Sequence, residues 1–162
     1  EPRPVYLSRF LAPAKALSPS SGKLRRSMSS SFVIDTYAWV EYLLGSKAGE
    51  KAKEYIEGGP CMTPSIVLSE LRRWYLREIE AGRRTDREMR MHFAFLESAA
   101  EIVPLDASLA LKAGETDFVM KKRIKNWPLT DSIVYTTAKS RAAQLVSGDP
   151  HFKGLEDVIF IL

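Results

Sequence analysis

The sequence predicts an α/β domain with a central, mainly parallel sheet of four to five strands that helices cover on both faces. Short apolar runs alternate with segments of helical length from Phe32 onwards. Strands that alternate with helices over one short domain are typical of a parallel sheet. The first run, Phe32-Val33-Ile34, has no polar residue between its apolar ones, which indicates a strand buried on both faces.

Length and composition are those of an ordinary globular domain. The 162 residues suffice for one domain with a substantial core, and the hydrophobic fraction of 45% and charged fraction of 27% are typical of such domains. No apolar run approaches the ~20 residues that a membrane-spanning helix needs. A single cysteine, Cys61, allows neither an internal disulfide nor a CxxC zinc site. We therefore expect a reducing, cytoplasmic setting and no membrane partner.

Residues 1–30 differ in composition from the rest of the chain. They are rich in proline, serine and basic residues and follow neither the strand nor the helix period. We expect a linker, a tail or a non-native extension here, with Met28 as a candidate native start, and a folded domain over residues 31–162. Residues 1–27 carry a net charge of +5 against +4 for the whole chain. The folded part is thus close to neutral, and bulk charge alone does not indicate a nucleic-acid partner.

Turn and capping residues delimit the elements of the first half. The expected elements are a strand over 32–34, helices over 36–44 and 48–56, a strand over 61–63, and helices over 64–81 and 85–99. Gly58-Gly59-Pro60 closes the second helix, because glycine and proline interrupt helices. Thr63-Pro64 predicts an N-cap followed by proline at the first helical position. Thr85 and Glu88 have the spacing of a capping box.

The second half continues the alternation. The expected elements are a strand over 101–105, helices over 106–122 and 130–143, and strands over 145–147 and 158–162. Asp106 is suited to cap the helix that it begins, and Thr130 or Asp131 begins the next one. The three strands of this half complete the sheet, and no internal repeat is present.

Four acidic residues stand where strands end or helices begin. Asp35 directly follows the first strand, and a carboxylate there costs free energy unless a cation or a hydrogen-bond donor meets it. Asp149 follows the strand over 145–147, and open α/β sheets bind ligands at this edge. Glu70 lies on the apolar side of its helix, and Asp131 lies near the start of another. We expect all four side chains at one edge of the sheet.

Each acid except Asp35 also has a simpler interpretation. Glu70 could pair with a nearby arginine on a solvated face, Asp131 could only complement a helix dipole, and Asp149 could be an Asp-Pro turn residue. Like charges gathered at one edge, however, repel one another without a counter-cation. Oxygen ligands suit Mg²⁺ or Mn²⁺, and such an ion can support hydrolysis of a phosphodiester. The set therefore predicts a metal-dependent phosphodiester chemistry.

Four short segments carry these acids. They are Val33-Ile34-Asp35-Thr36, Ser69-Glu70-Leu71, Leu129-Thr130-Asp131-Ser132-Ile133 and Ser147-Gly148-Asp149-Pro150-His151-Phe152. In order and approximate spacing, from about Phe32 to Leu162, they resemble the PIN domain family and most closely its small VapC-type toxins. The resemblance implies a three-layer α/β/α sandwich and a Mg²⁺- or Mn²⁺-dependent endoribonuclease. It also implies an RNA substrate, frequent homodimers and a VapB-type antitoxin partner.

Carried over by position, the resemblance makes the four acids the catalytic and metal-binding residues. It also makes Ser147 and Thr36 supporting residues of the site. The extension before Met28 and the polar pair Thr136-Thr137 depart from the family pattern, and neither touches the acids.

Several other residues are weaker candidates. Asp117 is either an outer ligand or a surface acid beside Lys121. His151 could assist catalysis, although a loop histidine after an Asp-Pro turn is more often structural or solvated. We expect the pairs Trp74-Tyr75 and Trp39 with Tyr42 to pack in the core or on a dimer face. Two basic runs could hold an RNA backbone or be solvated helix ends; their candidate residues are Arg83, Arg84, Arg87, Lys121, Lys122 and Lys125.

The resulting interpretation is a metal-dependent endoribonuclease that acts as the toxin of a toxin–antitoxin pair. Two alternatives stay open. One is a housekeeping PIN nuclease of ribosomal or messenger RNA processing. Growth arrest on expression would indicate a toxin instead. The other is a non-catalytic PIN-like scaffold that binds metal without turnover.

Overall fold

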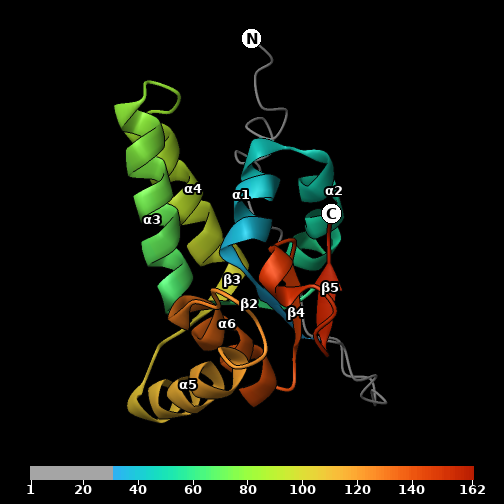
Figure 1. The fold of residues 1–162 in the computed structure, drawn as a ribbon. Coiled ribbons are helices and arrows are strands. Elements are labelled where there is room, and N and C mark those ends of the chain that lie inside the picture. The colour runs from blue at the N-terminus through green and yellow to red at the C-terminus, as the bar shows by residue number, and fades with distance from the viewer. Residues whose placement is uncertain (1–30) are drawn as a thin grey trace, which may run out of the picture.

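The computed structural model describes residues 31–162, which form one five-stranded sheet with helices around it (Figure 1). The strands are β1 (Phe32–Ile34), β2 (Cys61–Pro64), β3 (Ala100–Val103), β4 (Gln144–Ser147) and β5 (Val158–Phe160). Their order is β3-β2-β1-β4-β5, and every neighbouring pair is parallel. The expected parallel sheet is thus confirmed. The predicted extension over residues 1–30 lies outside the described residues.

Helices link the strands and form the outer layers. They are α1 (Thr36–Leu44), α2 (Lys47–Glu57), α3 (Ser65–Glu80), α4 (Asp86–Ala99), α5 (Ala107–Met120) and α6 (Leu129–Ser140), with a 3₁₀ turn η2 (Pro150–Phe152). Helices α1 and α2 pack together, as do α5 and α6, while α3 and α4 lie side by side and extend beyond the sheet (Figure 1). The α/β/α arrangement is therefore confirmed. Within residues 31–162, no helix is long and apolar enough to cross a membrane.

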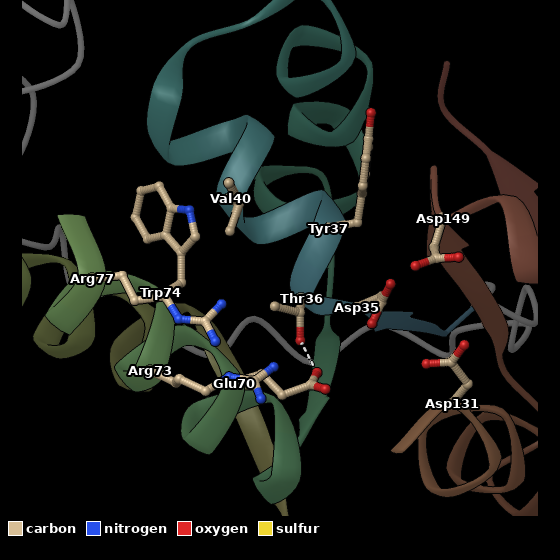
Figure 2. Close-up of a pocket in the computed structure, with 10 residues that line it drawn as sticks. All are labelled: Asp35, Thr36, Tyr37, Val40, Glu70, Arg73, Trp74, Arg77, Asp131 and Asp149. Carbon is tan, nitrogen blue, oxygen red and sulfur yellow. Dashed lines mark hydrogen bonds between the residues drawn. The ribbon is translucent and has the colours of Figure 1, made fainter. Parts of the chain in front are cut away.

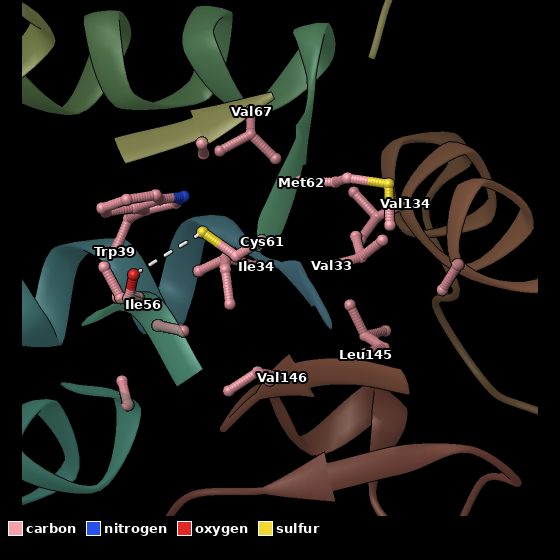
Figure 3. Packing of buried hydrophobic residues seen from close by; sticks show 14 of the residues in the cluster. Val33, Ile34, Trp39, Ile56, Cys61, Met62, Val67, Val134, Leu145 and Val146 are labelled. Carbon is pink, nitrogen blue, oxygen red and sulfur yellow. Dashed lines mark hydrogen bonds between the residues drawn. The ribbon is translucent and has the colours of Figure 1, made fainter. Parts of the chain in front are cut away.

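The central strands bury side chains on both faces. The register places Val33 beside Met62 and Leu145, and Figure 3 shows this row on the side of the sheet that α6 covers. Ile34 and Val146 pair in the next row, which lies toward α1 and α2. Val33 and Ile34 are both fully buried. The uninterrupted apolar run of β1 is explained by this burial on two faces.

The predicted start of α3 was wrong by one residue. Pro64 was expected at the first helical position, but its ψ of 141° is extended and it pairs with Val103 in the ladder between β2 and β3. Pro64 therefore ends the strand, and Thr63 accepts a hydrogen bond from the Trp39 indole at 2.8 Å instead of capping a helix. The capping box of α4 is confirmed, since the Thr85 hydroxyl accepts from the Glu88 N–H at 3.2 Å.

The order of the strands creates a switch point beside β1. From β1 the chain moves outward through β2 to β3 and then crosses back to β4 on the other side of β1. The loops that leave the carboxyl ends of β1 and β4 therefore diverge, and ligands of open α/β sheets bind in the crevice at such a point.

Candidate metal and active site

Asp35 follows β1 directly at this switch point. Its carboxylate makes no capping bond to α1; instead, Oδ2 accepts a hydrogen bond from the Ser147 hydroxyl at 2.6 Å. Only 6% of the residue is exposed, and this burial is the main cause that raises the pKa of Asp35 to about 6. The bond from Ser147 opposes the rise in pKa, whereas the charges of Glu70 and Asp149 add to it.

Ser147, the last residue of β4, connects two of the acids. Its fully buried hydroxyl donates to Asp35 and accepts from the Asp149 N–H at 3.0 Å. The Asp149 carboxylate accepts in turn from the His151 N–H at 2.8 Å, which starts the 3₁₀ turn η2. The backbone after β4 is thereby fixed relative to the carboxylate that follows β1.

Glu70 reaches the same place from the second turn of α3. Val67 and Leu71 lie on the buried face of that helix, so the packing of α3 against the core orients Glu70 beside α1. There its Oε2 accepts a hydrogen bond from the Thr36 hydroxyl at 2.5 Å. Glu70 forms no ion pair with any described residue. The simpler interpretation, a surface pair with an arginine, therefore has no support in residues 31–162.

Asp131 lies in the first turn of α6, across the pocket from Glu70 (Figure 2). Its side chain is 14% exposed, and Oδ2 lies 2.9 Å from Nδ1 of His151. Burial is the largest cause that raises the pKa of Asp131 to about 8, and the charges of the other three acids raise the pKa further. A favourable helix dipole alone would stabilise the carboxylate and lower its pKa. The environment of Asp131 is thus dominated by burial and uncompensated negative charge.

The four acids line one open pocket of about 270 Å³ (Figure 2). Figure 2 shows Asp131 and Asp149 on one side of the pocket and Glu70 on the α3 side, with Asp35 between them. The remaining lining residues are Thr36, Tyr37, Val40, Arg73, Trp74 and Arg77. The structure therefore brings together the whole predicted acidic set with Thr36, and Ser147 supports it through hydrogen bonds.

Asp117 does not line this pocket. Its carboxylate pairs with Lys121 at 2.8 Å and accepts a hydrogen bond from the Ser132 hydroxyl at 3.2 Å. The same hydroxyl accepts from the buried indole N–H of Trp127 at 2.6 Å. Asp117 is thus hydrogen-bonded to Ser132, the residue after Asp131, and its link to the pocket is indirect, through the start of α6.

None of the basic residues predicted to hold RNA lines the pocket. Arg83 pairs with Glu78 at 2.7 Å, and Arg84 lies 3.6 Å from Glu88. This α3–α4 connection, which also leads to Arg87, is at the end of the helix pair that extends away from the sheet (Figure 1). The other three candidates are exposed and follow the end of α5; they are Lys121, Lys122 and Lys125.

The pocket contains residues that the sequence interpretation missed. Arg73 and Arg77 are among the nearby arginines considered only as ion-pair partners of Glu70, and Trp74 was expected to pack in the core or on a dimer face. Trp39, Tyr42 and Tyr75 are indeed buried, but Trp74 is half-buried and lines the pocket. A usable signal existed, because positions 70, 73, 74 and 77 share one face of a helix. His151 was also undervalued, since its distance from both Asp131 and Asp149 depends on the fold of η2.

The donor set fits a hard divalent cation. Asp131, Asp149 and His151 each offer a ligand atom, and these three atoms lie within 4.8 Å of one another. Burial and the mutual repulsion of the acids raise the pKa of Asp35 and of Asp131, and a bound cation would relieve both effects. Carboxylate oxygens are the ligands that Mg²⁺ and Mn²⁺ prefer.

Comparisons with known proteins identify the family and the fold. The family model of the PIN domain matches residues 32–158. A search of curated protein sequences finds no match. Among solved structures, the VapBC2 complex from Rickettsia felis bound to a promoter DNA fragment has a TM-score of 0.59 at 17% identity, covering 80% of this chain and 96% of the other.

Two further structures share the fold. PAE2754 from Pyrobaculum aerophilum has a TM-score of 0.60 at 15% identity, covering 82% of this chain and 91% of that one. The sarcin-ricin loop cleaving toxin VapC20 from Mycobacterium tuberculosis has a TM-score of 0.56 at 20% identity, covering 78% and 98%. The TM-scores show a common fold, and the family model spans most of the sequence. The chain therefore belongs to the PIN domain family.

Proposed function

We propose that this chain is a metal-dependent endoribonuclease and the toxin of a VapBC-type toxin–antitoxin pair. The observation that carries the proposal is the convergence of four acids from β1, α3, α6 and the turn after β4 in one pocket. Membership of the PIN family supports a nuclease. The likeness to VapBC complexes supports a VapB-like antitoxin partner, and the likeness to a sarcin-ricin loop cleaving toxin supports an RNA substrate.

Mg²⁺ or Mn²⁺ is the cofactor that the pocket suits. Asp35, Asp131 and Asp149 would hold the ion, and Glu70 would either join them or orient the attacking water. When bound, the cation would neutralise the acids and supply positive charge to the phosphate under attack.

The protein's own contribution is to hold the carboxylates in place before substrate arrives. The Ser147 hydroxyl donates a hydrogen bond to the Asp35 carboxylate and accepts one from the Asp149 N–H. The Thr36 hydroxyl donates a hydrogen bond to Glu70. Carboxylates fixed in this way need little reorganisation during the reaction. The Thr36 hydroxyl binds one oxygen of Glu70, and the other oxygen would be the one to accept a hydrogen bond from the attacking water.

The proposal is tested by incubating purified protein with a panel of structured RNAs in Mn²⁺, in Mg²⁺ and in EDTA. Asp131→Asn is the test variant, and Glu156→Gln, which changes an acid with an 83% exposed side chain, is the matched control. We expect cleavage that needs both the metal and Asp131 and is unaffected in the control. Metal binding by calorimetry without cleavage of any RNA would support the scaffold alternative. Absence of metal binding would contradict the assignment of the acidic residues.

The toxin role needs a separate test in cells. Expression of the wild-type chain should arrest growth, expression of Asp131→Asn should not, and co-expression of a neighbouring antitoxin gene should restore growth. Cleavage in vitro without growth arrest would favour the housekeeping nuclease instead. A cytoplasmic location and a homodimer belong to the same proposal, and light scattering of the purified protein tests the dimer.

A further inference from the structure

We infer that the α3 wall of the pocket, formed by Arg73, Trp74 and Arg77, binds the single-stranded RNA segment next to the cleaved phosphate. The two arginines would contact its phosphates, and Trp74 would stack on a base. This inference rests on the proposed function, because it takes RNA as the substrate. It assigns substrate binding to residues other than the acids and other than the basic runs picked from the sequence.

Helix geometry places these side chains beside the acids. Arg73, Trp74 and Arg77 follow Glu70 by three, four and seven residues, which is the spacing of one helix face. All three line the pocket that contains the acids. Figure 2 shows both guanidinium groups projecting from α3 toward the part of the pocket where Thr36 meets Glu70. A ligand that contacts the acids therefore lies within reach of α3.

The two arginines are free to bind an anion. Neither guanidinium forms an ion pair within residues 31–162, whereas Arg83, Arg84 and Arg90 each pair with an acid of α3 or α4. Arginine binds phosphate through a planar fork of donors and is favoured wherever phosphate is recognised. Arg73 and Arg77 are one helical turn apart, about 6 Å along the axis, so each can meet a different phosphate of one strand.

The two arginines offset part of the negative charge of the pocket. Its four carboxylates and two arginines have a formal charge of −2 when all are ionised. A strand of RNA carries a negative charge at every phosphate, so the acidic side alone would repel it. Because both arginines lie on α3 and the three aspartates lie across the pocket from it, we infer that the strand enters along α3 and presents one phosphate to the acids.

Trp74 offers a surface for a base. The indole packs edge-on against Tyr75 with ring centroids 4.7 Å apart and planes at 79°. Tyr75 is buried and its hydroxyl is hydrogen-bonded to Nδ1 of His92 on α4, so the ring against which the indole packs is itself held in place. Figure 2 shows the ring of Trp74 standing beside Val40 at the edge of the pocket. A half-buried aromatic ring next to arginines is a combination that single-stranded nucleic-acid sites use.

The test measures RNA binding separately from cleavage. A short fluorescein-labelled single-stranded RNA of mixed sequence is titrated in Mn²⁺ with the full chain carrying Asp131→Asn, which prevents turnover. In this background the test variants are R73Q/R77Q and Trp74→Ala. The matched controls are R83Q/R87Q, which removes two positive charges that do not line the pocket, and Trp74→Phe, which keeps an aromatic ring. Circular dichroism checks that each variant is folded.

The two contact types have different signatures. R73Q/R77Q should weaken binding. It should also make the negative slope of log affinity against log salt shallower by about 1.4, since each single-strand phosphate contact contributes about −0.7. Trp74→Ala should weaken binding by about 5- to 150-fold without changing that slope, and Trp74→Phe should recover most of the loss. R83Q/R87Q should leave affinity and slope close to those of the parent.

The outcomes separate this inference from the proposed function. If the chain without Asp131→Asn cleaves RNA but R73Q/R77Q and Trp74→Ala bind it as the parent does, the inference is overturned and the nuclease stands. The inference is likewise overturned if these variants lose affinity only for a protein partner, because the α3 wall would then be a protein-binding surface. If the chain neither binds nor cleaves RNA, the proposed function fails and the inference fails with it.

Discussion

The hydroxyl of Ser147 lies 2.6 Å from Oδ2 of Asp35, although the two residues are 112 positions apart in the sequence. The same hydroxyl accepts the backbone N–H of Asp149 at 3.0 Å. One buried serine at the end of β4 therefore joins two carboxylates of the candidate metal site at the switch point of the sheet. The geometry of the acids thus depends on residues that would not themselves touch a cation.

Replacement of Ser147 by alanine should weaken metal binding. The change removes a donor from the Asp35 carboxylate and an acceptor from the Asp149 backbone, and loss of such supporting bonds costs about 10- to 100-fold in metal affinity or activity. Calorimetric titration with Mn²⁺ measures the effect. Ser147→Thr, which keeps the hydroxyl, should retain most of the affinity; equal affinity of Ser147→Ala and the wild type would contradict the role given to this hydroxyl.

Asp35→Asn should abolish cleavage yet stabilise the metal-free protein as the pH rises. The pKa of Asp35 is about 6 in the folded chain against an ordinary value of 3.8, so the folded state holds its proton more tightly than the unfolded state. Wild-type stability therefore falls between about pH 4 and pH 6, on the order of 3 kcal/mol for this group, and asparagine avoids that loss.

Urea unfolding in EDTA at several pH values measures this difference. The gap between Asp35→Asn and the wild type should open as the pH rises from about 4 to about 6 and stay constant above that. If the variant is less stable than the wild type by the same amount at every pH, ionisation of Asp35 does not destabilise the folded protein.

Affinity for Mn²⁺ should increase with pH. Burial and the neighbouring acids raise the pKa of Asp131 to about 8, so near neutral pH a cation must displace a proton from this group. The affinity should rise by up to about tenfold per pH unit for each proton displaced, and level off above about pH 8. Calorimetry in buffers of different ionisation enthalpy counts the released protons; a constant affinity from pH 6 to pH 9 would exclude Asp131 as a ligand.

Removal of the His151 ring should weaken metal binding by removing a contact of the Asp131 carboxylate. Nδ1 lies 2.9 Å from Asp131 and 3.3 Å from Asp149, so the imidazole contacts both acids after β4 and at the start of α6. His151→Ala should lower Mn²⁺ affinity about tenfold. His151→Asn, which keeps a donor of similar reach, should lose less, and unchanged affinity in both variants would make the histidine a passive neighbour.

Ser132→Ala should destabilise the start of α6. The buried Trp127 indole N–H donates to the Ser132 hydroxyl at 2.6 Å, and alanine leaves that N–H without its acceptor. We expect a loss of about 1 to 3 kcal/mol in the free energy of unfolding. Urea denaturation measures it, with the exposed Ser98→Ala as a control expected within about 0.5 kcal/mol of the wild type. Equal stabilities would show that the indole finds another partner.

The alternation of elements was predictable because its signals are local. The apolar run of β1, the capping box of Thr85 with Glu88, and the Gly-Gly-Pro stop after α2 each act over a few residues. The start of α3 was wrong for the opposite reason. Pairing with β3 keeps Pro64 extended, and that partner lies 39 residues along the chain.

The sequence alone determined which elements form and which residues carry the concentrated negative charge, because helix periods, caps and strand ends are properties of neighbouring residues. Asp35 and Asp149 could be placed at one edge since parallel strands present their carboxyl ends together. Only the tertiary structure decided that Ser147 bonds to Asp35, that His151 meets Asp131, and that the α3 wall rather than the exposed basic runs faces the acids. These contacts depend on strand order, register and helix packing, which bring together segments far apart in the chain.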